Sequence, residues 1–277
     1  MPNAIIPVGG DRRLEVLTGG KEGGRTVVFH YGTPMGLVPF DPLSAVAAER
    51  GLRLVVIGRP GYGDSTPQPG RSVADVSSDV ASVLDGMGVD EFFTIGWSGG
   101  GPHALACSAL LRDRCVRTAT IASVAPFDLF GPGWMADMGE ENVEEFNAAV
   151  AGEPDLVDFL DPFAAQLVGI DADGITGALG DLLPPVDKAN LQGPFADFMA
   201  ASMRAAVAKG IAGWRDDDLA FVKPWGFDLA EVGPLTIWQG SDDRMVPFAH
   251  GQWLAKAIPS ARANLLPGEG HLSLAVA

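Results

Sequence analysis

Cysteine and positive charge are scarce in this chain. Only Cys107 and Cys115 are present among 277 residues, and their spacing forms neither a disulfide framework nor a recognisable metal-binding pattern. Lys and Arg total 19 against 35 Asp and Glu, which gives a formal net charge of -16. Because such a charge repels nucleic-acid phosphates and anionic membrane surfaces, we expect no nucleic-acid or membrane partner.

Long hydrophobic runs are missing as well. No segment approaches the roughly 18 apolar residues of a membrane-spanning helix, and the chain does not begin with the basic and apolar stretches of a secretion signal. We therefore expect a soluble, cytoplasmic protein. The chain is 47% hydrophobic and long enough for one core domain with a sizeable interior. No feature of the sequence indicates an oligomeric state.

Short β-branched segments alternate with helical patterns in the first half of the chain and again near its end. A helical stripe of apolar residues follows Ser72, which opens a capping pattern with Asp75. The glycine-rich stretch 19–24 is expected to form a hairpin turn between the first strands. Near-continuous apolarity indicates buried parallel strands, expected at residues 26–30, 52–57, 91–96, 118–124, 235–239 and 261–266.

Between residues 126 and 225 the strand rhythm stops, and helical patterns rich in Ala, Phe, Met and acidic residues replace it. Helices are expected at 134–150, 155–168 and 194–209. So long a segment without structure of its own would be unusual in a compact domain. We therefore predict a helical cap, residues 126–225, inserted into a core of residues 1–125 and 226–277.

Ser98 stands in a G-x-S-x-G sequence between an expected strand and an expected helix, the context of a nucleophile elbow. The tight turn requires small residues beside the serine, and Gly96, Gly99 and Gly100 supply them. We predict that Ser98 is a nucleophile. The alternative is an ordinary glycine-rich turn with a capping serine.

A serine hydroxyl needs a base to become nucleophilic, and the chain has four histidines. His271 follows the last expected strand in a glycine-rich turn, from which an imidazole can reach the elbow, so we predict that it is the base. His103 is expected to pack inside the helix after Ser98. His250 is expected to be a partly exposed helix residue, and His30 is expected to brace a loop.

The acid that orients the base is expected in the turn after the strand at 235–239. Asp243, directly before an Arg-x-Val-Pro sequence, is our choice, and Asp242 is the competing carboxylate, favoured instead as a turn or capping residue. The developing oxyanion needs backbone N–H donors. We assign these to Gly99 and to Thr33, although the loop at Thr33 also fits an ordinary turn at the end of a strand.

Taken in order, these segments resemble the α/β-hydrolase superfamily, in particular its cap-bearing serine hydrolase branch. The segment from Gly58 to Ser65 is similar to an R-x-G-x-G-x-S sequence common in that family. The resemblance spans nearly the whole chain and implies an α/β class protein with the α/β-hydrolase fold, a mostly parallel sheet flanked by helices. Two departures are Tyr31, inserted into the oxyanion loop, and an end six residues after His271, where relatives place a final helix, so that helix is absent or lies outside this sequence.

The predicted function is a serine hydrolase that cleaves a small-molecule carboxylic ester through an acyl-enzyme intermediate, with no cofactor and no metal. Relatives that open epoxides or displace halides carry aspartate at the elbow, and the proline-iminopeptidase branch has a different elbow sequence, so Ser98 and Trp97 argue against these activities. Two alternatives stay open. One uses the same triad for amide or lactone hydrolysis, perhydrolysis or C–C cleavage, and the other is a non-catalytic small-molecule binding protein.

Apolar residues near the elbow and in the cap are candidates for a pocket that takes an apolar acyl or alcohol group. Aromatic residues and methionines at helical spacing more often form a cap's own core, so for the cap residues that alternative is favoured. The acids at 140, 141, 144 and 145 are expected on a solvated helix face, with attraction of a substrate amine as the alternative, and Asp216, Asp217 and Asp218 are assigned no chemistry. The pocket candidates are Trp97, His30, Tyr31, Phe159, Phe163, Phe195, Phe198, Met199 and Met203.

Overall fold

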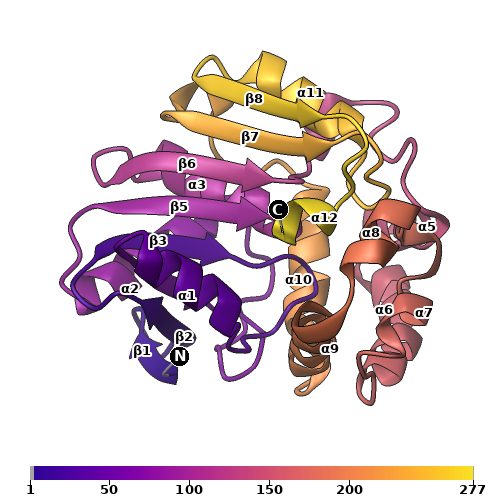
Figure 1. Cartoon of the computed structure of the whole chain (residues 1–277), viewed down its shortest axis with the longest axis horizontal. Coiled ribbons are helices and arrows are strands. Elements are labelled where there is room, and N and C mark those ends of the chain that lie inside the picture. Colours follow the sequence, from indigo (N-terminus) through magenta and orange to yellow (C-terminus); the bar gives the residue numbers. More distant parts are fainter. Residues whose placement is uncertain (1–2, 277) are drawn as a thin grey trace.

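The computed structural model of the protein describes residues 3–276 and contains an eight-stranded sheet (Figure 1). The strands follow the order β1-β2-β4-β3-β5-β6-β7-β8. Strands β3 to β8 run parallel, whereas β2 is antiparallel to both of its neighbours. The strands are β1 (Asn3–Pro7), β2 (Arg13–Gly20), β3 (Arg25–His30), β4 (Leu52–Ile57), β5 (Phe92–Trp97), β6 (Cys115–Ile121), β7 (Leu235–Gly240) and β8 (Ala261–Leu266).

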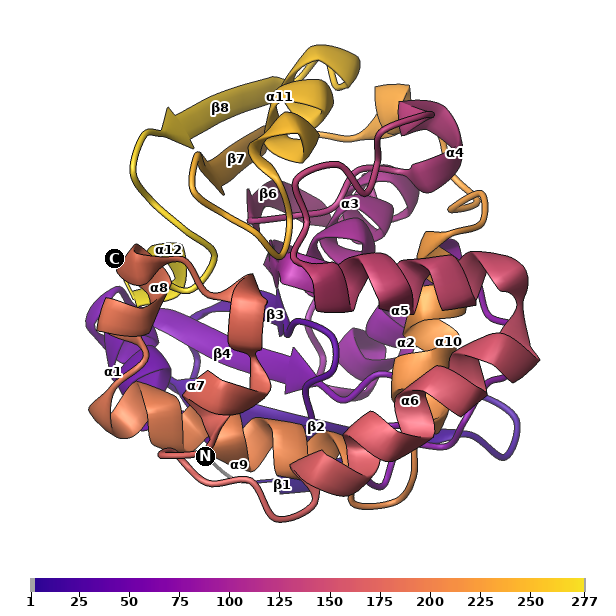
Figure 2. The same ribbon diagram turned by 90° about the vertical axis from the view of Figure 1, so that its right-hand side faces the viewer.

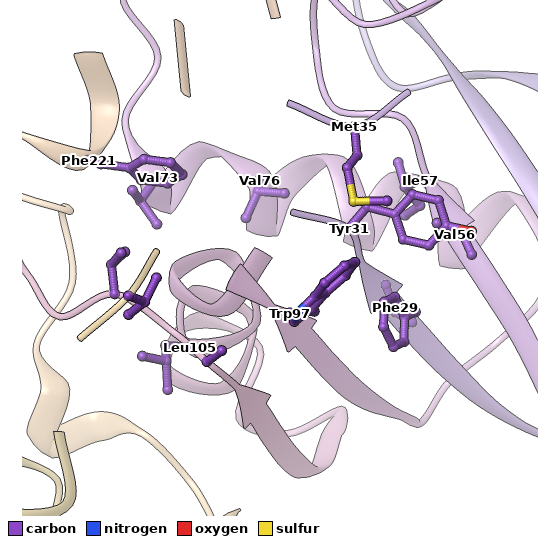
Figure 3. Close-up of a cluster of buried hydrophobic side chains, with 14 of the residues drawn as sticks. Phe29, Tyr31, Met35, Val56, Ile57, Val73, Val76, Trp97, Leu105 and Phe221 are labelled. Carbon is purple, nitrogen blue, oxygen red and sulfur yellow. The ribbon is translucent and has the colours of Figure 1, made fainter. Parts of the chain in front are cut away.

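Helices cover both faces of the sheet, with α1 on the near face in Figure 1 and α3 on the far face. Buried side chains of the central strands and of these helices form one apolar core, part of which Figure 3 shows around Trp97. The predicted α/β fold class is therefore confirmed. The helices outside the segment between β6 and β7 are α1 (Asp41–Glu49), α2 (Val76–Gly86), α3 (Gly101–Leu110), α11 (Phe248–Ala257) and α12 (Ser273–Val276).

The expected hairpin at residues 19–24 is wrong. The chain does turn there, but β2 pairs with β1 and β4, while β3 pairs with β4 and β5. Turn residues indicate that the chain reverses, and they do not specify which strand becomes the neighbour. The backbone of β2 instead forms hydrogen bonds with β4, in a register that places Val16 opposite Ile57.

The apolar stripe after Ser72 forms α2, preceded by a 3₁₀ turn at Val73–Asp75. The backbone N–H of Ser72 donates to the Asp75 carboxylate at 2.6 Å, which satisfies one of the donors left open at the start of the helix. Val80, Val83 and Leu84 are fully buried against the rest of the core. The sequence pattern thus predicts both the beginning of this helix and the face that it buries.

The segment between β6 and β7 forms a layer of helices beyond the carboxyl ends of the parallel strands (Figures 1 and 2). We call residues 126–225 the cap. Within residues 3–276, no helix is both long and apolar enough to cross a membrane. The cap helices are α4 (Phe127–Phe130), α5 (Glu140–Ala151), α6 (Glu153–Leu167), α7 (Ile175–Ala178), α8 (Pro185–Asn190), α9 (Gly193–Val207) and α10 (Ala212–Phe221).

Candidate active site

Ser98 is held on a strained turn between β5 and α3. Its φ of 56° lies in the left-handed region, which residues other than glycine rarely adopt. The ends of β3 and β5 and the start of α3 lie very close together at this turn. A side chain at Gly96 would overlap the Gly100 carbonyl, and one at Gly100 would overlap the His30 carbonyl. The local geometry is that of a nucleophile elbow, and it presents Ser98 at the carboxyl end of the sheet.

His271 and Asp243 form a buried hydrogen-bonded pair in the loops that follow β8 and β7, respectively. His271 Nδ1 lies 2.9 Å from Asp243 Oδ2, and both side chains are almost completely buried. The other carboxylate oxygen, Oδ1, accepts the backbone N–H groups of Met245 and Val246 at 2.9 and 2.8 Å. By contrast, Asp242 is exposed and accepts a hydrogen bond from the neighbouring Ser241 hydroxyl. Asp243 is therefore the carboxylate that contacts the imidazole.

The four histidines differ in their environments, and only His271 has a raised pKa. Burial alone would lower its pKa, but the charge and hydrogen bond of Asp243, with a smaller contribution from Asp187, raise it above its ordinary value. Burial lowers the pKa of His103 and of His250 to about 4, and it lowers the pKa of His30 well below its ordinary value.

The expected exposure of His250 is wrong. Its side chain is completely buried. Both ring nitrogens have partners there, since Nδ1 accepts the Ala125 N–H at 3.0 Å and Nε2 lies 2.7 Å from the Trp134 carbonyl oxygen. Stacking of the ring against Phe130 adds to this burial. The side chain therefore joins α11 to the start of the cap.

A carboxylate from the cap holds the backbone on which His271 is carried. Asp187 of α8 has no exposed surface and accepts the N–H groups of His271, Leu272 and Ser273 at 2.8, 2.9 and 2.9 Å. A side chain at Gly270 would overlap this carboxylate, so glycine permits the close approach. The position of the imidazole thus depends on a contact between cap and core as well as on Asp243.

The loop that contains Thr33 is fixed by a second buried carboxylate, Asp217 of α10. Asp217 pairs with Arg59 at 2.6 Å and with Arg71 at 2.8 Å. Although burial would raise the pKa of Asp217, the two arginine charges hold it well below its ordinary value. The Thr33 hydroxyl donates to Asp217 at 2.8 Å, and Arg59 donates to the Tyr31 carbonyl at 2.6 Å. The loop is therefore tied to the cap and the core together.

This loop lies directly beside the elbow. A methyl group at Gly32 would be 3.3 Å from Ser98 Cβ, and a side chain at Gly99 would collide with Thr33. The backbones of Thr33 and Gly99, the two predicted oxyanion donors, are thus brought together next to the serine. Within residues 3–276 the Ser98 hydroxyl makes no hydrogen bond to a protein atom, although Ser98 and His271 line the same pocket.

The pocket lies between the elbow and the cap, and its wall is mostly apolar. Of the residues that the sequence suggested for it, Trp97, Phe159, Phe163, Met199 and Met203 line the wall. Met35 and Phe221, which Figure 3 labels in the same cluster of buried hydrophobic side chains as Trp97, line it too. The cap helices α5, α6, α9 and α10 therefore contribute much of the surface that would contact a substrate.

Four of the suggested residues lie outside the pocket wall, which corrects the prediction for them. His30 points into the core, with its ring 6.4 Å from that of His103 and its Nε2 3.8 Å from Cys107 Sγ. The Tyr31 hydroxyl donates to the Val38 carbonyl, and its ring packs edge-on against Phe198. Phe198 stacks on Phe40 and Phe195 lies 6.0 Å from the same ring, so both face the packing between α9 and the core.

Asp187, Asp217 and Asp218 contact or line the site, and sequence reasoning assigned no role to any of them. The run Asp216 to Asp218 indicates a polar turn by composition, yet it lies inside α10 and all three side chains are buried. The sequence signal that was available is the pair Arg59 and Arg71, because buried arginines require acidic partners. Within residues 3–276 no cluster of His, Cys, Asp and Glu is arranged to hold a metal ion.

The pKa of His271 provides a test of the Asp243 contact. Asp243→Asn removes the charge that stabilises the imidazolium, so we expect the pKa of His271 to fall toward or below its ordinary value of about 6.5. An NMR titration of the imidazole resonances measures it. Asp242→Asn, an exposed neighbour, is the matched control and should leave the titration unchanged. A larger effect of Asp242→Asn would show that the wrong carboxylate has been assigned.

The hydrogen bonds between Asp187 and the backbone at residues 271–273 provide a second test. Asp187→Ala leaves three buried N–H groups without an acceptor, so the free energy of unfolding should fall by at least about 2 kcal/mol. The exposed cap variant Asp197→Ala should change it by less than about 0.5 kcal/mol. Urea denaturation measures both. Equal losses of unfolding free energy in the two variants would contradict the assigned contact. The pKa of His271 should also fall in Asp187→Ala and stay unchanged in Asp197→Ala.

Comparison with known proteins agrees with this architecture. The family model described as the alpha/beta hydrolase fold matches residues 25–277. Epoxide hydrolase B of Mycobacterium tuberculosis is 29% identical over 244 residues, which cover 84% of this chain and 63% of that protein, so the chain spans less than two thirds of that relative. A non-heme haloperoxidase of Rhodococcus erythropolis is 24% identical over 90% of this chain and 86% of its own.

Solved structures show the same fold at low sequence identity. A hydrolase from Pseudomonas aeruginosa superimposes with a TM-score of 0.69 at 20% identity, covering 98% of this chain and 92% of its own. Its likeness extends through both the sheet and the helices between β6 and β7, because almost the whole chain is covered. From the matched family model, the sheet order and the elbow, the chain belongs to the α/β-hydrolase family.

Proposed function

We propose that the protein is a serine hydrolase that cleaves carboxylic esters of small molecules through an acyl-enzyme intermediate. The observation that carries the proposal is the buried His271–Asp243 pair, which borders the same pocket as the strained Ser98. An imidazole whose Nδ1 is held by a carboxylate presents its Nε2 for proton transfer. Ser98 is then the nucleophile, His271 the general base and Asp243 the orienting acid.

In the proposed reaction, Ser98 Oγ attacks the acyl carbon while its proton passes to His271 Nε2. The carbonyl oxygen becomes an oxyanion, for which the N–H groups of Thr33 and Gly99 are the donors. Donors of this kind contribute about 3–4 kcal/mol to acyl transfer in other enzymes. Collapse of the tetrahedral intermediate expels the alcohol, which takes the proton from His271. Water, deprotonated by the same imidazole, then releases the acid and restores Ser98.

The chemistry of a serine nucleophile favours acyl substrates over epoxides. Attack of Ser98 on an epoxide would form an alkyl ether, which an activated water does not cleave, whereas an acyl-serine ester is readily hydrolysed. A carboxylate nucleophile would form a cleavable ester from an epoxide, but the elbow has serine at that position. Epoxide opening, the activity in the name of the Mycobacterium relative, is therefore not what we propose for this chain.

The wall of the pocket supports a substrate with an apolar acyl or alcohol group. Phe159 and Phe163 stack with ring centroids 4.8 Å apart and both line the pocket, together with Met199. Burial of apolar surface against such residues stabilises binding by about 25 cal/mol per Å². We propose a medium-sized apolar group on the acyl or the alcohol side of the ester.

Hydrolysis of p-nitrophenyl esters of increasing acyl length tests the proposal. We expect turnover by the wild type, and a fall in kcat of at least about a thousandfold in Ser98→Ala with an unchanged fold. The exposed variant Ser78→Ala is the matched control and should retain wild-type turnover. Turnover of anilides or lactones without esters would show that the substrate assignment is wrong. Ester turnover that survives in Ser98→Ala would refute the nucleophile itself.

A further inference from the structure

Two cap carboxyl groups face the same pocket as Ser98 and have no role in the proposed acyl transfer. Asp218 of α10 is completely buried, and within residues 3–276 neither of its carboxyl oxygens accepts a hydrogen bond from an amide, hydroxyl or cationic group. Glu145 of α5 also lines the pocket, and it accepts one hydrogen bond, from Trp214 Nε1 at 2.6 Å. Buried polar atoms are normally satisfied, so the unpartnered oxygens of Asp218 require an explanation.

The pocket wall around Asp218 and Glu145 carries acidic side chains without basic ones to balance them. No Lys or Arg lines the pocket within the described part of the chain, whereas Glu141, Glu145 and Asp218 do. The neighbouring Asp217 is neutralised by Arg59 and Arg71, which donate to the carbonyls of Gly32 and Gly213 respectively and do not line the pocket. Within the described residues none of these three acids forms a salt bridge, and the charge of Arg71 contributes less to the pKa of Asp218 than burial and Glu145 do.

The two carboxyls also oppose each other's ionisation. Burial, followed by the charge and the hydrogen bond of Glu145, raises the pKa of Asp218 well above its ordinary value. Burial also raises the pKa of Glu145, against the hydrogen bonds from Asp218 and Trp214. Two interacting carboxyls in an apolar site share a proton and together keep about one negative charge. A ligand cation would replace the shared proton, which would leave to solvent, and would provide donors to both groups.

We propose that Asp218 and Glu145 form a binding site for a protonated primary or secondary amine carried by the substrate. An ammonium group supplies several N–H donors for the Asp218 oxygens. Its positive charge would also offset the negative charge of the acids that line the pocket. The aromatic rings of Phe146, Trp214 and Phe221 line the same pocket, and such rings also attract cations. This inference rests on the proposed function, since it makes the substrate an amine-bearing ester.

A neutral substrate of the same shape would be bound less well. An alkanol supplies one O–H donor and no positive charge, so the charge-assisted hydrogen bonds of the ammonium group, worth about 1.5–3 kcal/mol each, would be lost. The expected discrimination is therefore at least about tenfold in Kd between an ammonium ligand and its neutral isostere.

Calorimetric binding of n-alkylamines and of the matching n-alkanols, from butyl to octyl, to the Ser98→Ala protein tests the site without turnover. We expect the best amine to bind at least about tenfold more tightly than its alkanol. Asp218→Asn in the same background should remove most of that preference, and Glu145→Gln provides a second, independent substitution. Glu144→Gln, an exposed acid on the same helix and outside the pocket wall, is the matched control and should keep the preference.

The outcomes separate this site from the proposed ester chemistry. Equal affinity for amines and alkanols, or a preference that survives both Asp218→Asn and Glu145→Gln, would overturn the amine site even where p-nitrophenyl esters are hydrolysed. Amine binding that depends on Asp218 in a protein that hydrolyses no ester would support the site and refute the proposed function. With both established, kcat/KM for ω-amino esters should exceed that for their uncharged analogues in the wild type, and Asp218→Asn should reduce this ratio.

Discussion

The buried ion pair between Asp217 and Arg59 is the interaction on which the site depends. A carboxylate without exposed surface is stable only when it is paired and hydrogen-bonded, and Arg59 with Arg71 provides the opposite charge. Removal of one partner from such a pair typically costs about 3–5 kcal/mol, because the remaining charge stays buried. Since Arg59 also donates to the Tyr31 and Gly32 carbonyls, the loop that carries Thr33 and helix α10 of the cap are held together.

The same arrangement recurs at the other side of the pocket. Asp243 of the core holds the imidazole of His271, and Asp187 of the cap holds its backbone. Cap residues therefore help to position two loops of the core, the one that carries Thr33 and the one that carries His271. Asp218 differs from these carboxylates, because within residues 3–276 it forms no salt bridge and accepts no hydrogen bond from an amide, hydroxyl or cationic group, and it faces the pocket beside a second acid, Glu145.

Patterns local in sequence predicted much of the fold, whereas contacts between distant segments did not follow from them. The strands at 52–57 and 261–266 agree with β4 and β8 because apolar runs and flanking turns are local signals. The partner of β2, the burial of His250 and the packing of Phe198 depend on segments far away in the sequence. Likewise, a run of three aspartates indicates a turn until Arg59, Arg71 and Trp214 are placed around it. The nucleophile, base and acid were proposed from sequence motifs, and their roles stay predictions that kinetic measurements must test.

Intact mass after exposure to a small fluorophosphonate, measured on the wild type and on Ser98→Ala, tests the proposed serine chemistry most directly. The reagent modifies a serine efficiently only when a neighbouring base activates it, and it needs no knowledge of the substrate. We expect one adduct on the wild type and none on the variant. A folded wild type that forms no adduct, or an adduct that persists in Ser98→Ala, would contradict the assignment of Ser98 as a nucleophile activated by His271.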